Sequence, residues 1–137
     1  MYIKLSVVEK SYKFKKAERL CSTAQIEELF NEHETLFKFP FKLVWRKIEE
    51  ERKHPVQLSI SVGKKRFRNA VDRNYMKRHI REAYRLNKHI VLDHCNGFSI
   101  DMMLIYVDTK LRSFVDIEPS MKEVLNKLAK EISNIES

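Results

Sequence analysis

A run of Arg and Lys residues in the middle of the chain has the spacing of one helical face. Like charges at positions i and i+4 repel each other by a few tenths of a kcal/mol per pair. A face that accumulates such repulsion favours phosphate binding over an ordinary solvated surface, because each Arg can donate two hydrogen bonds to a phosphate and binding releases counterions. At 100° per residue the cations fall within an arc of about 140°, with Asn74 in its middle: Arg73, Lys77, Arg78, Arg81, Arg85 and Lys88.

The segment just before this helix is also cationic. It precedes a helix N-terminus, which attracts anions by itself. Phe67 lies within the segment and could stack on a base or anchor the loop in the core, and the sequence leaves both readings open. The cations of this loop are Lys64, Lys65, Arg66 and Arg68.

The whole chain is basic and of single-domain size. It has 137 residues, a formal net charge of +8 and 43% hydrophobic residues. This composition predicts one folded domain with a polyanionic partner. No apolar run approaches the roughly 20 residues of a membrane span, and no signal peptide is recognisable. We therefore expect a cytoplasmic protein whose two cysteines, Cys21 and Cys95, are free thiols.

The hydrophobic spacing predicts six elements that must position these cations. Ser22 or Thr23 caps a helix to about Glu34, and Ser120 with Glu123 forms a capping box for the last helix. Between these two helices we expect a strand over 39–46, a second strand over 56–62 that pairs with it, a helix over 70–87 capped by Asn69 and a strand over 98–107. The last helix reaches residue 132. The expected fold is an α+β or α/β sandwich in which helices flank one sheet.

Residues that could catalyse a reaction are not arranged for it. His89, His94 and Cys95 lack a matching second pair of zinc ligands. The carboxylates show no nuclease-like pattern, and the chain has no glycine-rich phosphate loop. We expect no catalytic residue, metal site or bound cofactor in this chain.

Three segments together resemble the protein component of bacterial ribonuclease P. They are Ser61-Val62-Gly63-Lys64-Lys65, then 69–74 (Asn-Ala-Val-Asp-Arg-Asn), then 77–85 (Lys-Arg-His-Ile-Arg-Glu-Ala-Tyr-Arg). The resemblance covers residues 12–133 in its order of elements, and its specific motifs lie in 61–85. Two positions depart from the family pattern: Tyr75 stands where the family has Arg, and the loop Arg66-Phe67-Arg68 lacks a glycine.

The resemblance implies a single domain over 1–137 with an N-terminal extension at 1–13 and a left-handed β-α-β crossover. It implies that the protein binds the catalytic RNA of ribonuclease P through Lys64, Lys65, Arg66, Arg68, Arg73, Asn74, Lys77, Arg78, Arg81 and Arg85. It also implies a cleft for the 5′ leader of precursor tRNA, bordered by Phe30, Phe41, Lys42 and Trp45. The chain would then be a subunit of an endoribonuclease in which the RNA, with magnesium ions, performs the hydrolysis.

Other classes of binding protein remain as alternatives. A ribosomal or other structural RNA-binding protein would share the charge and the fold class. A DNA-binding helix-turn-helix would need a short helix before the basic helix, where a strand and loop are expected. A membrane-surface helix would need a richer apolar stripe than one containing His79 and Ala83. We expect no DNA or membrane partner.

Overall fold

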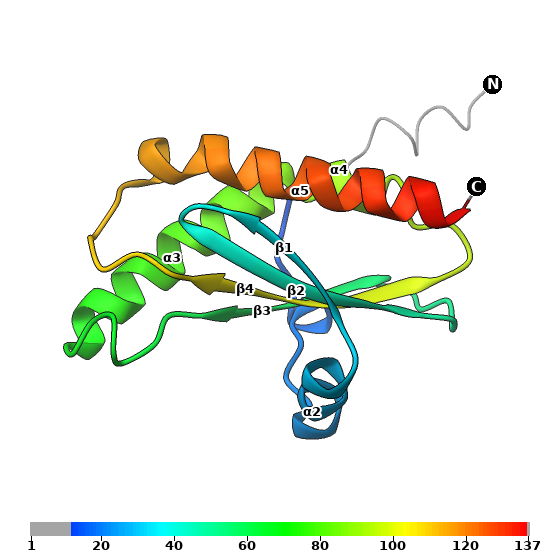
Figure 1. Cartoon of the computed structure of the whole chain (residues 1–137), viewed down its shortest axis with the longest axis horizontal. Coiled ribbons are helices and arrows are strands. Elements are labelled where there is room, and N and C mark those ends of the chain that lie inside the picture. Colours follow the sequence, from blue (N-terminus) through cyan, green and yellow to red (C-terminus); the bar gives the residue numbers. More distant parts are fainter. Residues whose placement is uncertain (1–11, 137) are drawn as a thin grey trace.

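A computed structural model describes residues 12–136 and shows one α+β domain, a four-stranded sheet with helices on both faces (Figure 1). This confirms the predicted fold class. Residues 1–11 of the expected N-terminal extension lie outside the described residues. The elements are η1 (Lys16–Glu18), α2 (Thr23–Asn31), β1 (Glu34–Lys38), β2 (Phe41–Ile48), β3 (Val56–Ser61), α3 (Ala70–Asn87), α4 (His89–Leu92), β4 (Ser99–Tyr106) and α5 (Phe114–Glu136).

The strands lie in the order β1-β2-β4-β3. β2 pairs antiparallel with both β1 and β4, whereas β3 pairs parallel with β4. The prediction that the second strand pairs with the first was wrong, because β4 lies between β2 and β3. A parallel pair needs a crossover connection, and here α3 and α4 provide it.

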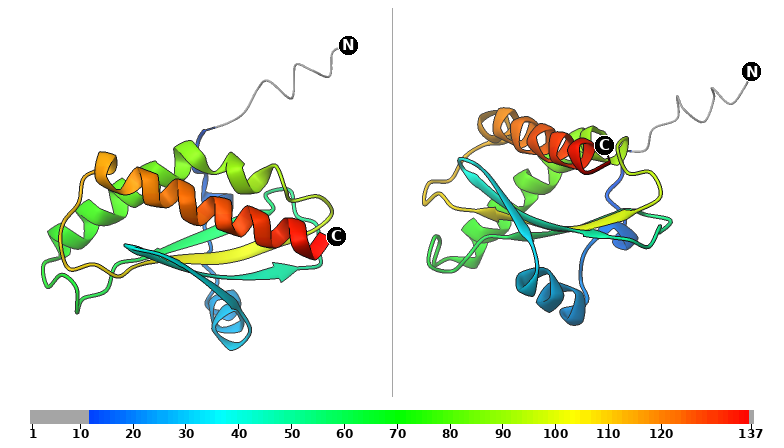
Figure 2. Two further views of the ribbon diagram at one scale, coloured as in Figure 1. Left: turned by 45° about the horizontal axis from the view of Figure 1, so that its top comes forward. Right: turned by 45° about the vertical axis from the view of Figure 1, so that its right-hand side comes forward.

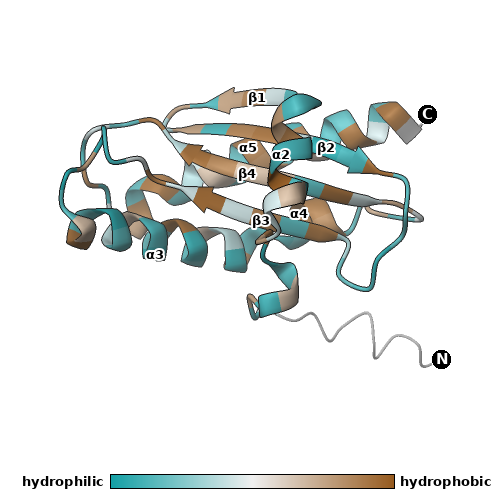
Figure 3. Cartoon of the chain, turned by 90° about the horizontal axis from the view of Figure 1, so that it is seen from below, coloured by the Kyte–Doolittle hydropathy of each residue, from teal (hydrophilic) through white to brown (hydrophobic). Residues whose placement is uncertain are grey.

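The crossover from β3 through α3 to β4 is left-handed. Figure 3 views the sheet from the face that carries α2, with β3 and β4 both pointing to the left and β4 above β3. α3 lies on the far side of the sheet, since Figure 1 places it on the side of α5. The hand is opposite to the general preference for such connections and is the one that the resemblance implies.

The helices divide into two layers. α3 and α5 cover one face of the sheet and α2 lies on the other, as both views of Figure 2 show. The larger core fills the space under α3 and α5, and it includes Phe41, Trp45, Leu104, Tyr84 and Leu125. A smaller cluster under α2 contains Leu20, Leu29, Val44 and Met103. The sheet therefore buries apolar side chains on both faces, most completely in β2 and β4.

α2 begins where the sequence predicts and ends earlier. The Ser22 hydroxyl accepts a hydrogen bond from the Gln25 backbone N–H at 3.4 Å, which confirms the N-cap. The helix ends at Asn31 rather than near Glu34, because the chain turns into β1, a strand that sequence analysis missed.

α3 spans Ala70–Asn87, as predicted, although the side chain of Asn69 makes no capping hydrogen bond. The expected start of α5 was wrong. Its capping box is formed by Ser113 and Asp116, each of whose side chains accepts the backbone N–H of the other. Ser120 lies inside the helix, and its hydroxyl donates to the Phe39 carbonyl at 2.9 Å.

Candidate nucleic-acid interface

α3 presents a polar face outward and packs with the other, as the spacing predicts. Met76, Ile80, Ala83 and Tyr84 are buried in the core. The predicted arc of cations, which we call the stripe, lies on the opposite side, where Asn74, Arg78 and Arg81 are exposed and Arg73, Lys77 and Arg85 are half-buried. Tyr75, which departs from the family pattern, packs its ring against His79 with 4.3 Å between the centroids.

Two arginines of the stripe already have partners within the protein. The Arg73 guanidinium donates to the backbone carbonyls of Phe67 and Arg68, at 2.8 and 2.9 Å. Arg73 therefore holds the end of the basic loop against α3. Arg85 donates to Glu82 at 2.5 Å and to the Tyr12 carbonyl at 2.9 Å. The hydrogen bond from Arg85 lowers the pKa of Glu82, so this carboxylate stays charged beside the stripe.

The other cations of α3 have no such partners. Within residues 12–136, Lys77, Arg78 and Arg81 make no hydrogen bond or ion pair. Lys77 and Arg81 also line a shallow pocket with Arg19 and Ser59, which joins the stripe to the edge of β3. Among the described residues, three cations and no carboxylate line this pocket, an arrangement that favours an anion.

The basic loop adds exposed cations around one apolar anchor. Phe67 is buried and stacks on Tyr106, with ring centroids 6.1 Å apart and planes 23° from parallel. Of the two readings of Phe67, the structure supports the anchor. The loop side chains that remain exposed are Lys64, Lys65, Arg66 and Arg68.

Lys88 does not belong to the stripe, although its helical position places it there. Its side chain is 2% exposed and its ammonium pairs with Glu18 Oε1 at 2.7 Å. The ammonium also donates to the Lys13 carbonyl. The segment before α2 is thus fastened to the C-terminal end of α3, a contact between residues 70 positions apart that helical spacing cannot reveal.

α2 divides the other face of the sheet into two flanks. Leu29 packs down on Val44 and Met103, which mark the middle of the face. Strand pairing places Arg46 beside Asp101 and Gln57 on one side of this row, and Lys42 beside Phe37 and Ile105 on the other.

The first of these sides, which we call the closed flank, is filled by polar contacts. Asp101 is fully buried. Its carboxylate forms ion pairs with the guanidinium group of Arg52, at 2.9 Å, and with that of Arg46, at 3.8 Å. Arg46 also lies 3.7 Å from Glu28 of α2. Gln25 of α2 donates to the side chain of Gln57 at 3.3 Å. These contacts bind α2 to the sheet on this flank.

The opposite side, which we call the open flank, has no such contacts to α2. Helical spacing turns Ile26 and Phe30 toward this flank, because Gln25 and Glu28 face the other. Phe30 is 49% exposed, and Lys42 is exposed on the same flank of the sheet. At its β3 end this flank leads through Ser61 to the basic loop.

Two of the four residues predicted for a leader cleft lie elsewhere. Phe41 and Trp45 are 0% and 2% exposed in the larger core, on the face covered by α3 and α5. Their assignment was wrong because side chains alternate along a strand, and Lys42, between them, points to the α2 face. Phe30 and Lys42 do lie on the open flank. Sequence analysis missed Phe37, the exposed aromatic residue of β1.

Comparison with known proteins shows which family this chain resembles. The family model for ribonuclease P matches residues 14–129. The ribonuclease P protein component of Porphyromonas gingivalis is 37% identical over 116 residues, which cover 83% of this chain and 85% of that protein.

The chain belongs to the ribonuclease P protein component family. The Staphylococcus aureus ribonuclease P protein superposes with a TM-score of 0.63 at 28% identity, covering 84% of this chain and 97% of that one. The Thermotoga maritima protein has the same fold, with a TM-score of 0.65 at 23% identity and coverage of 80% and 96%. Membership makes the chain a subunit of an endoribonuclease holoenzyme, the function that the resemblance implied.

Two further features concern metals and membranes. Within the described part of the chain, no three His, Cys, Asp or Glu side chains lie close enough together to hold a metal ion. No helix formed by residues 12–136 is long and apolar enough to cross a membrane.

Proposed function

We propose that the basic loop and the polar face of α3 bind the catalytic RNA of ribonuclease P, while the open flank receives the 5′ leader of precursor tRNA. The observation that carries this proposal is a continuous run of cations from the loop through Arg78 and Arg81 to the pocket at the β3 edge, none of them paired within the described part of the chain. Counterion release from phosphates makes such a surface favourable for RNA.

The individual residues have different tasks in this proposal. Arg78 and Arg81 contact RNA phosphates, because they are exposed and have no partner among residues 12–136. Arg73 instead positions the loop, since both of its carbonyl contacts fix the loop backbone. Phe30 offers a ring on which a leader base can stack, and Lys42 lies on the same flank to contact a phosphate.

The hydrolysis itself belongs to the RNA partner in this proposal. Magnesium ions bound by that RNA supply the metal-ion chemistry, and the protein binds no cofactor of its own. The side chains of the proposed surface are cations at neutral pH, so they offset phosphate repulsion rather than abstract a proton. The holoenzyme acts in the cytoplasm, where precursor tRNA is made.

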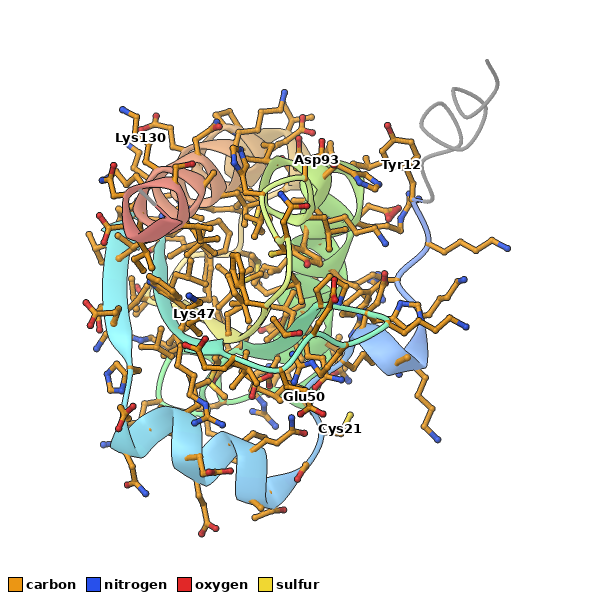
Figure 4. The ribbon with its side chains drawn as sticks, turned by 90° about the vertical axis from the view of Figure 1, so that its right-hand side faces the viewer. Tyr12, Cys21, Lys47, Glu50, Asp93 and Lys130 are labelled. Carbon is orange, nitrogen blue, oxygen red and sulfur yellow. The ribbon has the colours of Figure 1, made fainter. Side chains whose placement is uncertain are left out.

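The proposal is tested by removing two cations from α3 and two from elsewhere. The double variant Arg78→Ala/Arg81→Ala should bind the catalytic RNA at least about tenfold more weakly, and its log-log salt slope should fall by about 1.4. The control, Lys122→Ala/Lys130→Ala, changes the net charge equally on exposed positions of α5. Figure 4 shows Lys130 on the side of the molecule away from α2.

Filter binding at several salt concentrations gives both quantities, and circular dichroism checks that the variants fold. An equal loss of affinity in the two variants would show that net charge alone drives binding and would refute the assignment of α3. The proposal that the open flank binds the leader is tested separately. It requires that the wild-type holoenzyme bind leader-bearing tRNA more tightly than mature tRNA.

A further inference from the structure

Phe37 continues the open flank beyond Lys42 to the edge of the sheet. It pairs in register with Lys42, which pairs in turn with Ile105 of β4. Side chains of directly paired residues lie on the same face of a sheet, so Phe37 shares the α2 face with Lys42. Phe37 is 53% exposed, the largest value among the Phe, Tyr and Trp residues of 12–136.

The strand that carries Phe37 is held from behind by α5. Lys127 donates from its ammonium to the Phe37 carbonyl at 3.0 Å. Lys38, whose side chain points to the opposite face, pairs with Glu123 at 3.5 Å. The backbone of β1 is therefore fixed while the Phe37 ring points outward. A fixed aromatic ring loses little conformational freedom when a planar group stacks on it.

The residues around the ring indicate what it binds. The row from Phe37 through Lys42 and Ile105 to Ser61 contains one cation and no carboxylate. An exposed aromatic ring beside a Lys is the combination with which proteins bind single-stranded nucleic acid, stacking on a base and pairing with its phosphate. A protein partner would need a wider apolar patch than one ring.

We propose that Phe37 stacks on a base of the precursor tRNA leader, further from the cleavage site than the bases that contact Phe30. This inference rests on the proposed function, which places the catalytic RNA at α3. The leader then enters the open flank from the β3 side. β1 lies three strands away from β3, about 14 Å at the usual spacing. Phe37 therefore meets the leader only after it has crossed β4 and β2.

The geometry predicts a dependence on leader length. In holoenzymes reconstituted with Phe37→Ala, we measure equilibrium binding of precursor tRNAs with leaders of about 2 to about 12 nucleotides, a range matched to single-strand sites. Affinity for long leaders should fall roughly tenfold, whereas affinity for the shortest leaders and for mature tRNA should not change. Wild-type affinity should rise at the length where the variant begins to differ.

Three further variants separate stacking from other effects. Phe37→Tyr keeps an aromatic ring and should retain the wild-type affinity, whereas Phe37→Leu keeps only apolar bulk and should behave like Phe37→Ala. Phe39→Ala is the matched control, since Phe39 is 48% exposed in the next turn but lies against the Arg112 guanidinium, 5.6 Å from the ring centroid. It should leave binding at all leader lengths unchanged.

The outcomes distinguish this inference from the function on which it rests. An equal loss for short and long leaders, or full affinity in Phe37→Leu, would overturn the stacking role of Phe37 while leaving the leader groove in place. If wild-type holoenzyme shows no preference for leader-bearing tRNA, the leader groove itself fails. A loss in Phe39→Ala as large as that in Phe37→Ala would also count against Phe37, because it would show a general effect of apolar surface.

Discussion

The two flanks of α2 differ although one helix and one sheet form both. On the closed flank, Arg46 and Arg52 reach toward the buried carboxylate of Asp101, and Glu28 approaches Arg46 from the helix. On the open flank, Phe30 and Lys42 remain exposed. The same backbone arrangement thus yields side chains engaged in polar contacts on one side and exposed side chains on the other.

Under the proposed function, pairing between side chains decides where RNA binds on this protein. An Arg whose N–H groups already bind a buried carboxylate has fewer donors left for an RNA phosphate than an unpaired Arg has. The same distinction holds on α3, where Arg73 is engaged with the loop carbonyls and Arg81 is not. A count of the cations on α3 would not distinguish Arg73 from Arg81.

The largest expected effect follows from breaking the closed flank at its centre. Asp101→Ala should lower the free energy of unfolding by about 3 kcal/mol, because it removes the buried carboxylate from two partly buried guanidinium groups and leaves Arg46 only the exposed Glu28. The side chains of Arg46 and Arg52 are only 21% and 18% exposed. Chemical denaturation followed by circular dichroism measures the loss.

Ser61→Ala is the control for Asp101→Ala on the open flank. Ser61 is half-buried at the end of β3 and should tolerate the change within about 0.5 kcal/mol. Equal destabilisation by the two variants would mean that the Asp101 network does not distinguish the flanks.

A smaller effect is expected from the open flank, on binding rather than on stability. Phe30→Ala should weaken binding of leader-bearing precursor tRNA to the holoenzyme by about 1 kcal/mol, or roughly fivefold, through loss of stacking. Binding of mature tRNA should not change. Because the ring is half exposed, thermal stability should remain near that of the wild type.

Asn31→Ala serves as the neighbouring control for Phe30→Ala. It truncates an exposed residue of the same helical turn, at a position that helical spacing turns away from the sheet. A loss of affinity for both tRNAs in Phe30→Ala would show that its ring does not contact the leader.

The sequence was most informative where local spacing governs structure. The bounds of α3 and its division into polar and apolar faces were predicted correctly, because helical periodicity places residues without knowledge of the rest of the fold. The start of α5 was misplaced because Ser113 and Ser120 both precede an acid by three residues, and only tertiary structure distinguishes them.

The proposed leader site could be predicted only in part. Phe30, Phe41 and Trp45 are all aromatic residues on apolar patterns, yet one is exposed and two are core. β2 is buried on both faces, so alternation along it does not show which face borders solvent. Phe37 was missed because β1 was not recognised, and its pairing with β2 sets the row in which Phe37 lies. The burial of Lys88 required knowledge of Glu18, far away in the sequence.

The smallest expected effect tests whether α2 itself closes its flank. Glu28→Gln removes the charge that approaches Arg46 at 3.7 Å from a side chain that is 62% exposed. Exposed ion pairs contribute between about 0 and 1 kcal/mol, so the free energy of unfolding should fall by less than about 0.5 kcal/mol. Arg46 keeps Asp101 as a partner, and the flank should stay closed. Affinity for leader-bearing tRNA should therefore equal that of the wild type in the same binding assay. A gain in affinity for leader-bearing tRNA would show that the ion pair with Glu28, rather than the one with Asp101, keeps Arg46 from contacting RNA. The difference between the two flanks would then depend on a residue of α2 and not on the sheet.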